Sequence, residues 1–149
     1  MGTLLDTTVF IEFERAVRSL ERRSAMSRAG KVLEEVLGGD DQVGISAITA
    51  SELLHGVHRA TDEHRARREA FVETILGAFP SIPFDMLAAR VHAQVWAGLA
   101  ATGTEIGAHD RIVAATALSV GWRVGTANLR HFRKVPGLEV LPIRIATST

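Results

Sequence analysis

Three carboxylates and one amide stand at the ends of apolar stretches of the chain. Asp6 ends "TLLD", Glu52 follows "QVGIS" by a few residues, Asp110 opens "DRIVAATALSVG", and Asn128 follows "WRVGTA". Carboxylates gathered at one place repel one another, and a bound cation relieves that repulsion. Mg²⁺ or Mn²⁺ suits such a place, because either ion accepts a few carboxylates plus waters. A cation of this kind can activate a water and neutralise a scissile phosphate, which is the chemistry of metal-dependent nucleases.

Each of these residues also has a purely structural interpretation. Asp6 could cap the helix that follows it, and Thr49 with Glu52 has the spacing of a capping box. Asp110 lies where the helix dipole favours an acid in the first turn, and Asn128 is a common turn residue. Their joint placement after successive strands favours the functional interpretation over the structural one.

The elements that must position these residues alternate between strand and helix. The expected strands are "TLLD", "QVGIS", "SIPF", "WRVGTA" and "LEVLPI", and the expected helices are residues 8–20, 29–37, 47–60, 62–79, 85–101 and 110–121. Because the strands are short and apolar throughout, a mainly parallel sheet covered on both faces is expected. The sequence therefore predicts one α/β domain over residues 1–149, a three-layer α/β/α sandwich with ligands beyond the carboxyl ends of its strands.

The composition excludes several classes of protein. The formal net charge is zero, which argues against a strongly basic nucleic-acid binder but allows local patches. The lack of cysteine excludes disulfides and thiolate metal sites, as is usual in a reducing cytosol. No apolar run is long enough to span a membrane, and no leader pattern opens the chain, so a cytoplasmic protein is expected.

Four segments of the chain resemble a known family: "LLDTTVFIE", "ISAITASELLHGV", "GAHDRIVAATALSVG" and "GTANLRHFRKVPGLEVL". In order and spacing they resemble a PIN domain, and closely the VapC-type toxins of bacterial toxin–antitoxin pairs. The resemblance covers nearly the whole chain. It implies a Mg²⁺- or Mn²⁺-dependent endoribonuclease that cleaves structured RNA such as tRNA or rRNA. It also implies a cognate VapB-type antitoxin as inhibitor and a homodimer.

The resemblance also implies roles for particular residues. Asp6, Asp110 and Glu52 match the metal-binding acids, and Thr126 and Asn128 complete the catalytic set. The metal would activate a water for in-line attack on a phosphodiester. An arginine of the antitoxin would pair with the acids and displace the cation.

One departure from the family pattern concerns a fourth acid. Many relatives carry an acid at the place of Asn128 or just before the following Phe, where this chain has His131. The missing charge weakens the case for a second tightly held metal. It also leaves open an alternative function, a PIN-fold RNA- or protein-binding module with weak or no catalysis.

Residues around the acids are expected to orient ligands and to bind RNA. Thr8 should orient ligands together with Thr126 and Asn128. RNA is repelled by the acids, so basic residues at the rim should offset that repulsion, with the candidates Arg111, Arg130, Arg133 and Lys134. Arg111 could instead form an ion pair with its neighbour Asp110. The apolar faces of residues 47–60 and 62–79 either contact the antitoxin and a second copy or belong to the core.

Two other interpretations of the sequence are disfavoured. A haloacid-dehalogenase-type phosphatase needs a second Asp two residues after the first, where this chain has Thr8. A helical iron site built from Glu52, His55 and His58 would need a matching second helix, which the sequence lacks.

Overall fold

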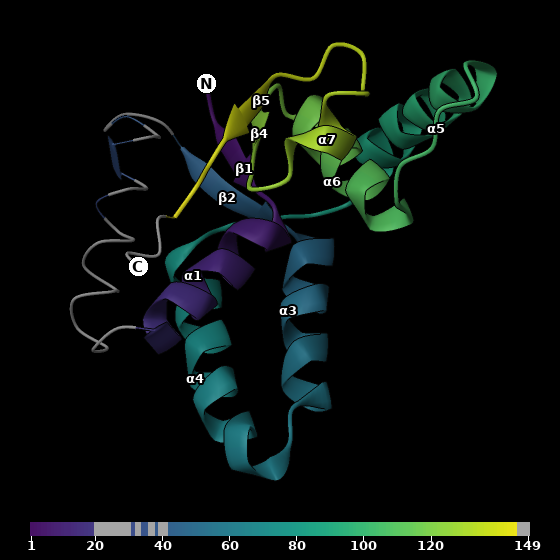
Figure 1. Cartoon of the computed structure of the whole chain (residues 1–149). Coiled ribbons are helices and arrows are strands. Elements are labelled where there is room, and N and C mark those ends of the chain that lie inside the picture. Colours follow the sequence, from purple (N-terminus) through teal and green to yellow (C-terminus); the bar gives the residue numbers. More distant parts are fainter. Residues whose placement is uncertain (20–30, 32–33, 36–37, 39–41, 146–149) are drawn as a thin grey trace.

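A five-stranded sheet with helices on both faces forms the centre of the computed structural model, which describes residues 1–19, 31, 34–35, 38 and 42–145 (Figure 1). The strands are β1 (Thr3–Leu5), β2 (Val43–Ser46), β3 (Ser81–Ile82), β4 (Arg123–Thr126) and β5 (Val140–Pro142). The helices are α1 (Thr7–Ser19), α3 (Ala47–Arg59), α4 (Asp62–Ala78), α5 (Met86–Ala101), α6 (Ala108–Ser119) and α7 (Leu129–Phe132).

The sheet is parallel throughout, in the order β3-β2-β1-β4-β5. In the central strand, Leu5 is in register with Ile45 of β2 and with Gly125 of β4. The amide of Asp6 continues this pairing by donating to the carbonyl of Gly125 at 2.9 Å. The carboxyl ends of β1, β2 and β4 therefore meet at one edge, and the residues that follow these strands start from neighbouring positions.

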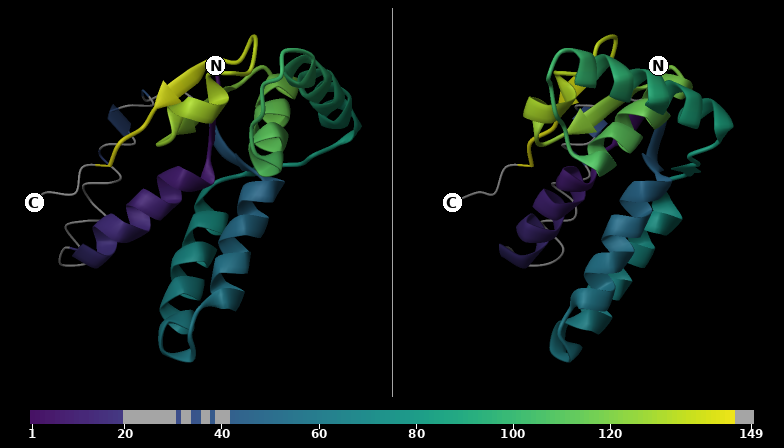
Figure 2. Two further views of the ribbon diagram at one scale, coloured as in Figure 1. Left: turned by 45° about the vertical axis from the view of Figure 1, so that its right-hand side comes forward. Right: turned by 90° about the vertical axis from the view of Figure 1, so that its right-hand side faces the viewer.

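Two hydrophobic cores lie on the two faces of the sheet, and successive residues of β1 point into different ones. Leu5 packs with residues of α1, α3 and α4, whereas Leu4 packs with residues of α5 and α6. In both views of Figure 2, α1, α3 and α4 lie together, apart from α5 and α6. The predicted three-layer α/β/α sandwich with a parallel sheet is confirmed.

The helices agree closely with the periodicity of the sequence. Residues 113–117 of α6 are all buried, as expected for a stretch that is apolar nearly all round. The apolar residues of α3 and α4 lie in the core with α1, so the interpretation of these faces as core holds. The short helix α7 was not predicted, and most of the predicted helix over 29–37 lies outside the described residues.

No helix in the described part of the chain is both long enough and apolar enough to cross a membrane.

Candidate active site

Asp6 is almost completely buried at the end of β1, with 3% of its surface exposed. The hydroxyls of Thr8 and Thr126 both donate to its Oδ2 atom, at 2.7 and 3.0 Å, and the backbone amide of Thr7 also bonds to the carboxylate. The amide of Ala127 in turn donates to the Thr8 hydroxyl at 3.1 Å. Asp6 directly precedes α1, as an N-cap would, but hydroxyls from α1 and β4 hold its carboxylate in one orientation.

The surroundings of Asp6 make its negative charge costly. Burial raises the pKa of Asp6 above its ordinary value, and the charge of Asp110 raises it further. Hydrogen bonds from Thr8, Thr126 and the backbone of Thr7 oppose this shift and lower the pKa. A cation bound at Asp6 would relieve both causes of the raised pKa.

We expect Asp6→Asn to stabilise the metal-free protein at neutral pH. Because the pKa of Asp6 is raised, the folded state binds its proton more tightly than the unfolded state does. The contribution of Asp6 to the free energy of unfolding is therefore most favourable below the ordinary carboxyl pKa. This contribution declines as pH rises through the raised pKa of Asp6 and stays low above it.

The measurement for Asp6→Asn is thermal unfolding in EDTA from mildly acidic to neutral pH. The melting temperature of the variant should exceed that of the wild type at neutral pH, and the difference should shrink as pH falls. A variant that melts below the wild type at neutral pH would show that lost hydrogen bonds outweigh the buried charge.

The cap of helix α3 is Ser46, not Thr49. The Ser46 hydroxyl accepts from the backbone amide of Thr49 at 3.1 Å, so Thr49 is already inside the first turn of the helix. Glu52 therefore lies beyond that first turn and cannot reach back to the cap. The capping-box interpretation of Thr49 and Glu52 is wrong. Strand β2 ends at Ser46, so the helix begins directly after it and the Ser46 hydroxyl accepts the hydrogen bond from a free amide of its first turn.

The carboxylate of Glu52 is held from two other elements. The Thr7 hydroxyl donates to its Oε1 atom at 3.0 Å, and Nδ1 of His109 lies 3.5 Å from its Oε2 atom. Sequence reasoning missed both residues. Their positions carried the signal, since Thr7 directly follows Asp6 and His109 directly precedes Asp110.

Asp110 lies in the first turn of α6 and contacts a histidine from α7. Nδ1 of His131 is 2.8 Å from Oδ2 of Asp110, which is an ion pair whenever the ring is protonated. His131 holds the place where the family pattern allows a fourth acid. The chain thus sets an imidazole against an existing acid where many relatives add another negative charge.

A hydrogen bond links the side chain of Thr126 to the backbone of Asn128. The Thr126 hydroxyl, which donates to Asp6, also accepts from the amide of Asn128 at 2.9 Å. The side chain of Asn128 is exposed and has no hydrogen-bond partner among the described residues. A contact from that side chain to a bound ligand stays a prediction.

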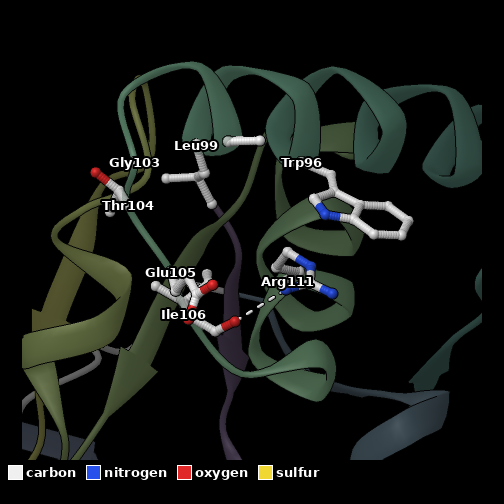
Figure 3. A pocket seen from close by; sticks show the side chains of 8 residues that line it. Trp96, Leu99, Gly103, Thr104, Glu105, Ile106 and Arg111 are labelled. Atoms are coloured by element: carbon white, nitrogen blue, oxygen red, sulfur yellow. Dashed lines mark hydrogen bonds between the residues drawn. The ribbon is translucent and has the colours of Figure 1, made fainter.

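Arg111 directly follows Asp110 but does not form the expected ion pair with it, and its contact with RNA stays a prediction. Its guanidinium carbon lies 4.8 Å from the centre of the Trp96 ring, and its Nη1 atom donates to the carbonyl of Ile106 at 2.9 Å (Figure 3). The side chains of Arg111 and Trp96 both border a hollow of about 410 Å³. No ion pair between Arg111 and Asp110 forms in the described structure, and the guanidinium is engaged by Trp96.

The acids suit a hard cation. Asp6, Asp110 and Glu52 offer only oxygen donors, which Mg²⁺ and Mn²⁺ prefer. Among the described residues, no three Asp, Glu, His or Cys side chains converge closely enough to enclose a metal ion by themselves. Mg²⁺ usually keeps several waters and needs only one or two carboxylates. Asp6 and Asp110, whose charges interact, fit that requirement.

Comparisons with known proteins identify the family. The PIN domain family matches residues 3–138. Ribonuclease VapC of Rickettsia bellii is 32% identical over 144 residues, which cover 96% of this chain and 97% of that protein. This chain is a PIN domain of the VapC ribonuclease family. The tRNA(fMet)-specific endonuclease VapC of Salmonella typhimurium is 35% identical over 96 residues, which cover 64% of this chain and 71% of the relative.

Solved structures of VapC-family pairs have the same fold. The chain matches DNA-bound VapBC from Salmonella typhimurium with a TM-score of 0.77 and 27% identity, over 95% of this chain and 98% of that chain. It also matches VapBC-5 from Mycobacterium tuberculosis, a toxin–antitoxin system, with a TM-score of 0.71 and 29% identity. That match again covers 95% of this chain and 98% of the other chain. The resemblance to VapC-type PIN domains is confirmed.

Proposed function

We propose that this VapC-family chain is the toxin of a type II toxin–antitoxin pair and a Mg²⁺- or Mn²⁺-dependent endoribonuclease. The observation that carries the proposal is the buried, hydroxyl-bonded carboxylate of Asp6, whose pKa is raised by burial and by the neighbouring charge of Asp110. A structural cap would not need a second acid beside it. Two carboxylates side by side suit a cation site, because the ion offsets the repulsion between them.

In this mechanism the chain provides an acidic site whose carboxylates are oriented by hydrogen bonds. Thr8 and Thr126 keep Asp6 in place, and Thr7 does the same for Glu52. When bound, the cation supplies a water of lowered pKa and neutralises charge on the phosphodiester. Asp6 and Asp110 would hold the ion, with Glu52 holding it directly or through a water.

The proposed substrate is structured RNA. Ribosomal RNA and tRNA both offer folded targets that a small protein can select by shape. The name of the relative from Salmonella typhimurium, a tRNA(fMet)-specific endonuclease, makes tRNA the first candidate to test. Such a substrate places the proposed activity in the cytoplasm.

The proposed partners are a VapB-type antitoxin and a second copy of the chain. The solved relatives named as VapBC pairs support the antitoxin. An arginine of the antitoxin would pair with the exposed part of the acidic site and exclude the cation. The homodimer rests on the family resemblance alone, and sedimentation of the pure chain would measure it.

The test of this function is cleavage of total tRNA by the antitoxin-free protein with Mg²⁺ or Mn²⁺. We expect discrete fragments that disappear in EDTA and return when Mn²⁺ is added in excess. A parallel calorimetric titration with Mn²⁺ distinguishes the alternative function. Intact RNA together with no Mn²⁺ binding would identify a PIN-fold binding module and reject the ribonuclease.

A further inference from the structure

A basic hollow lies beside the acidic site, at the carboxyl ends of β4 and β5. Its volume is about 350 Å³, and three arginines border it together with Thr126 and Asn128. These arginines, called here the basic hollow residues, are Arg130, Arg133 and Arg144. Among the described residues no Asp or Glu borders the hollow, and the charged side chains that do border it are all arginines.

The three arginines are free to bind a ligand. All are exposed, and none of their side chains has a hydrogen-bond or ion-pair partner among the described residues. Elsewhere exposed arginines do pair, as Arg18 does with Glu14 and Arg65 with Asp62. Three cations without a partner in the described part of the chain create a local positive field around one concave surface, although the formal net charge of the chain is zero.

The hollow and the acidic site have elements of the fold in common and share Thr126. Thr126 borders the hollow and donates to Asp6 at 3.0 Å. Helix α7 lies beside β5 (Figure 1). It places His131 against Asp110 and Arg130 at the border of the hollow. The amide of Ile143 donates to the carbonyl of Thr126 at 2.9 Å and holds the next residue, Arg144, at the same edge.

We propose that the basic hollow binds backbone phosphates of the RNA on one side of the bond to be cut, an inference that rests on the proposed ribonuclease function. A polyanion that lies across Asp6 and Asp110 is repelled there and needs positive charge close by. The planar guanidinium fork of arginine matches a phosphate group. Arg111 differs from these three, because its guanidinium already lies over the Trp96 ring and its Nη1 atom donates to the carbonyl of Ile106.

The test removes the three charges by Arg130→Gln, Arg133→Gln and Arg144→Gln in one protein. Binding of a short fluorescein-labelled single-stranded RNA is measured by anisotropy in EDTA, where no cleavage occurs, over a range of KCl concentrations. Three lost phosphate contacts should weaken binding by about tenfold or more and reduce the slope of log affinity against log salt by about 2. The corresponding triple Arg→Lys protein should recover most of that slope, because lysine also neutralises phosphate.

A matched control removes three exposed arginines from other elements, by Arg59→Gln, Arg67→Gln and Arg90→Gln on α3, α4 and α5. Net charge then falls equally in both proteins. The control should keep the wild-type salt slope. If control and hollow variants lose affinity equally, only total charge matters and the proposed subsite is wrong.

The outcome for the hollow is separable from the outcome for the proposed function. RNA binding in EDTA that depends on the hollow supports the subsite even if no RNA is cut when Mn²⁺ is present. Cleavage by the wild type with unchanged RNA affinity in the hollow variant would overturn the subsite and leave the ribonuclease intact. Circular dichroism and melting temperature check that each variant is folded.

Discussion

Asp110→Asn is expected to abolish metal-dependent RNA cleavage while the protein stays folded. The substitution keeps the size of the side chain but removes one of the two interacting carboxylates that are proposed to hold the cation. A metal contributes several kcal/mol of transition-state charge stabilisation, so we expect a loss of at least about a thousandfold in rate. Single-turnover cleavage of tRNA measures the rate, and a Mn²⁺ titration of the same sample should show weaker binding.

The control for Asp110→Asn is Asp62→Asn in the first turn of α4. The Asp62 side chain is 96% exposed and pairs with Arg65 on the same helix, outside the acidic site. This variant should cleave at the wild-type rate, since exposed ion pairs contribute little. Wild-type cleavage by a folded Asp110→Asn protein would reject the mechanism proposed here.

Phe10→Ala is expected to lower the free energy of unfolding by about 3–5 kcal/mol, the usual cost of deleting a buried phenyl ring. Phe10 is 2% exposed, and its ring centre lies 5.6 Å from that of Phe79. The loss would leave a cavity in the core that joins α1, α3 and α4 to the sheet. Urea unfolding followed by circular dichroism gives the change.

The matched control for Phe10→Ala is Phe84→Ala, the same chemical change at a side chain that is 40% exposed. Its ring contacts His92 but lies outside both cores. The loss should be clearly smaller than at Phe10, because less apolar surface leaves contact with the protein. Equal losses at the two positions would mean that the burial of Phe10 does not determine its contribution.

The secondary structure and the layers could be predicted from sequence because they depend on local periodicity. Short apolar runs predicted all five strands, although β3 proved to be only Ser81–Ile82. Apolar patterns of helical length predicted α1, α3, α4, α5 and α6 to within a few residues, and α6 was predicted from a stretch that is apolar nearly all round. Local rules failed at the start of α3, where Ser46 and Thr49 compete as caps and only the end of β2 selects Ser46.

The site was predicted in part. Asp6 could be named because parallel strands bring their carboxyl ends to one edge, so residues directly after neighbouring strands lie close together. Glu52 lies within α3, and Asp110 lies at the start of α6, which follows α5 and not a strand. The hydroxyls on Asp6 lie near the same edge, since Thr126 ends β4 and Thr8 stands in the first turn of α1, just after β1. The contact of Asp110 with His131 could not be predicted, because the two lie 21 residues apart and meet only through the packing of α7.

The sequence by itself determined the alternation of strands and helices, the parallel sheet and the acids at its edge, because each of these depends on residue type and short spacing. The tertiary structure alone decided which side chains meet around those acids. Arg111 could pair with Asp110 or face the RNA, and only the approach of α5 brings Trp96 to its guanidinium. Arg144 joins the basic hollow because β5 pairs with β4, and long-range contacts of this kind leave no local pattern in the sequence.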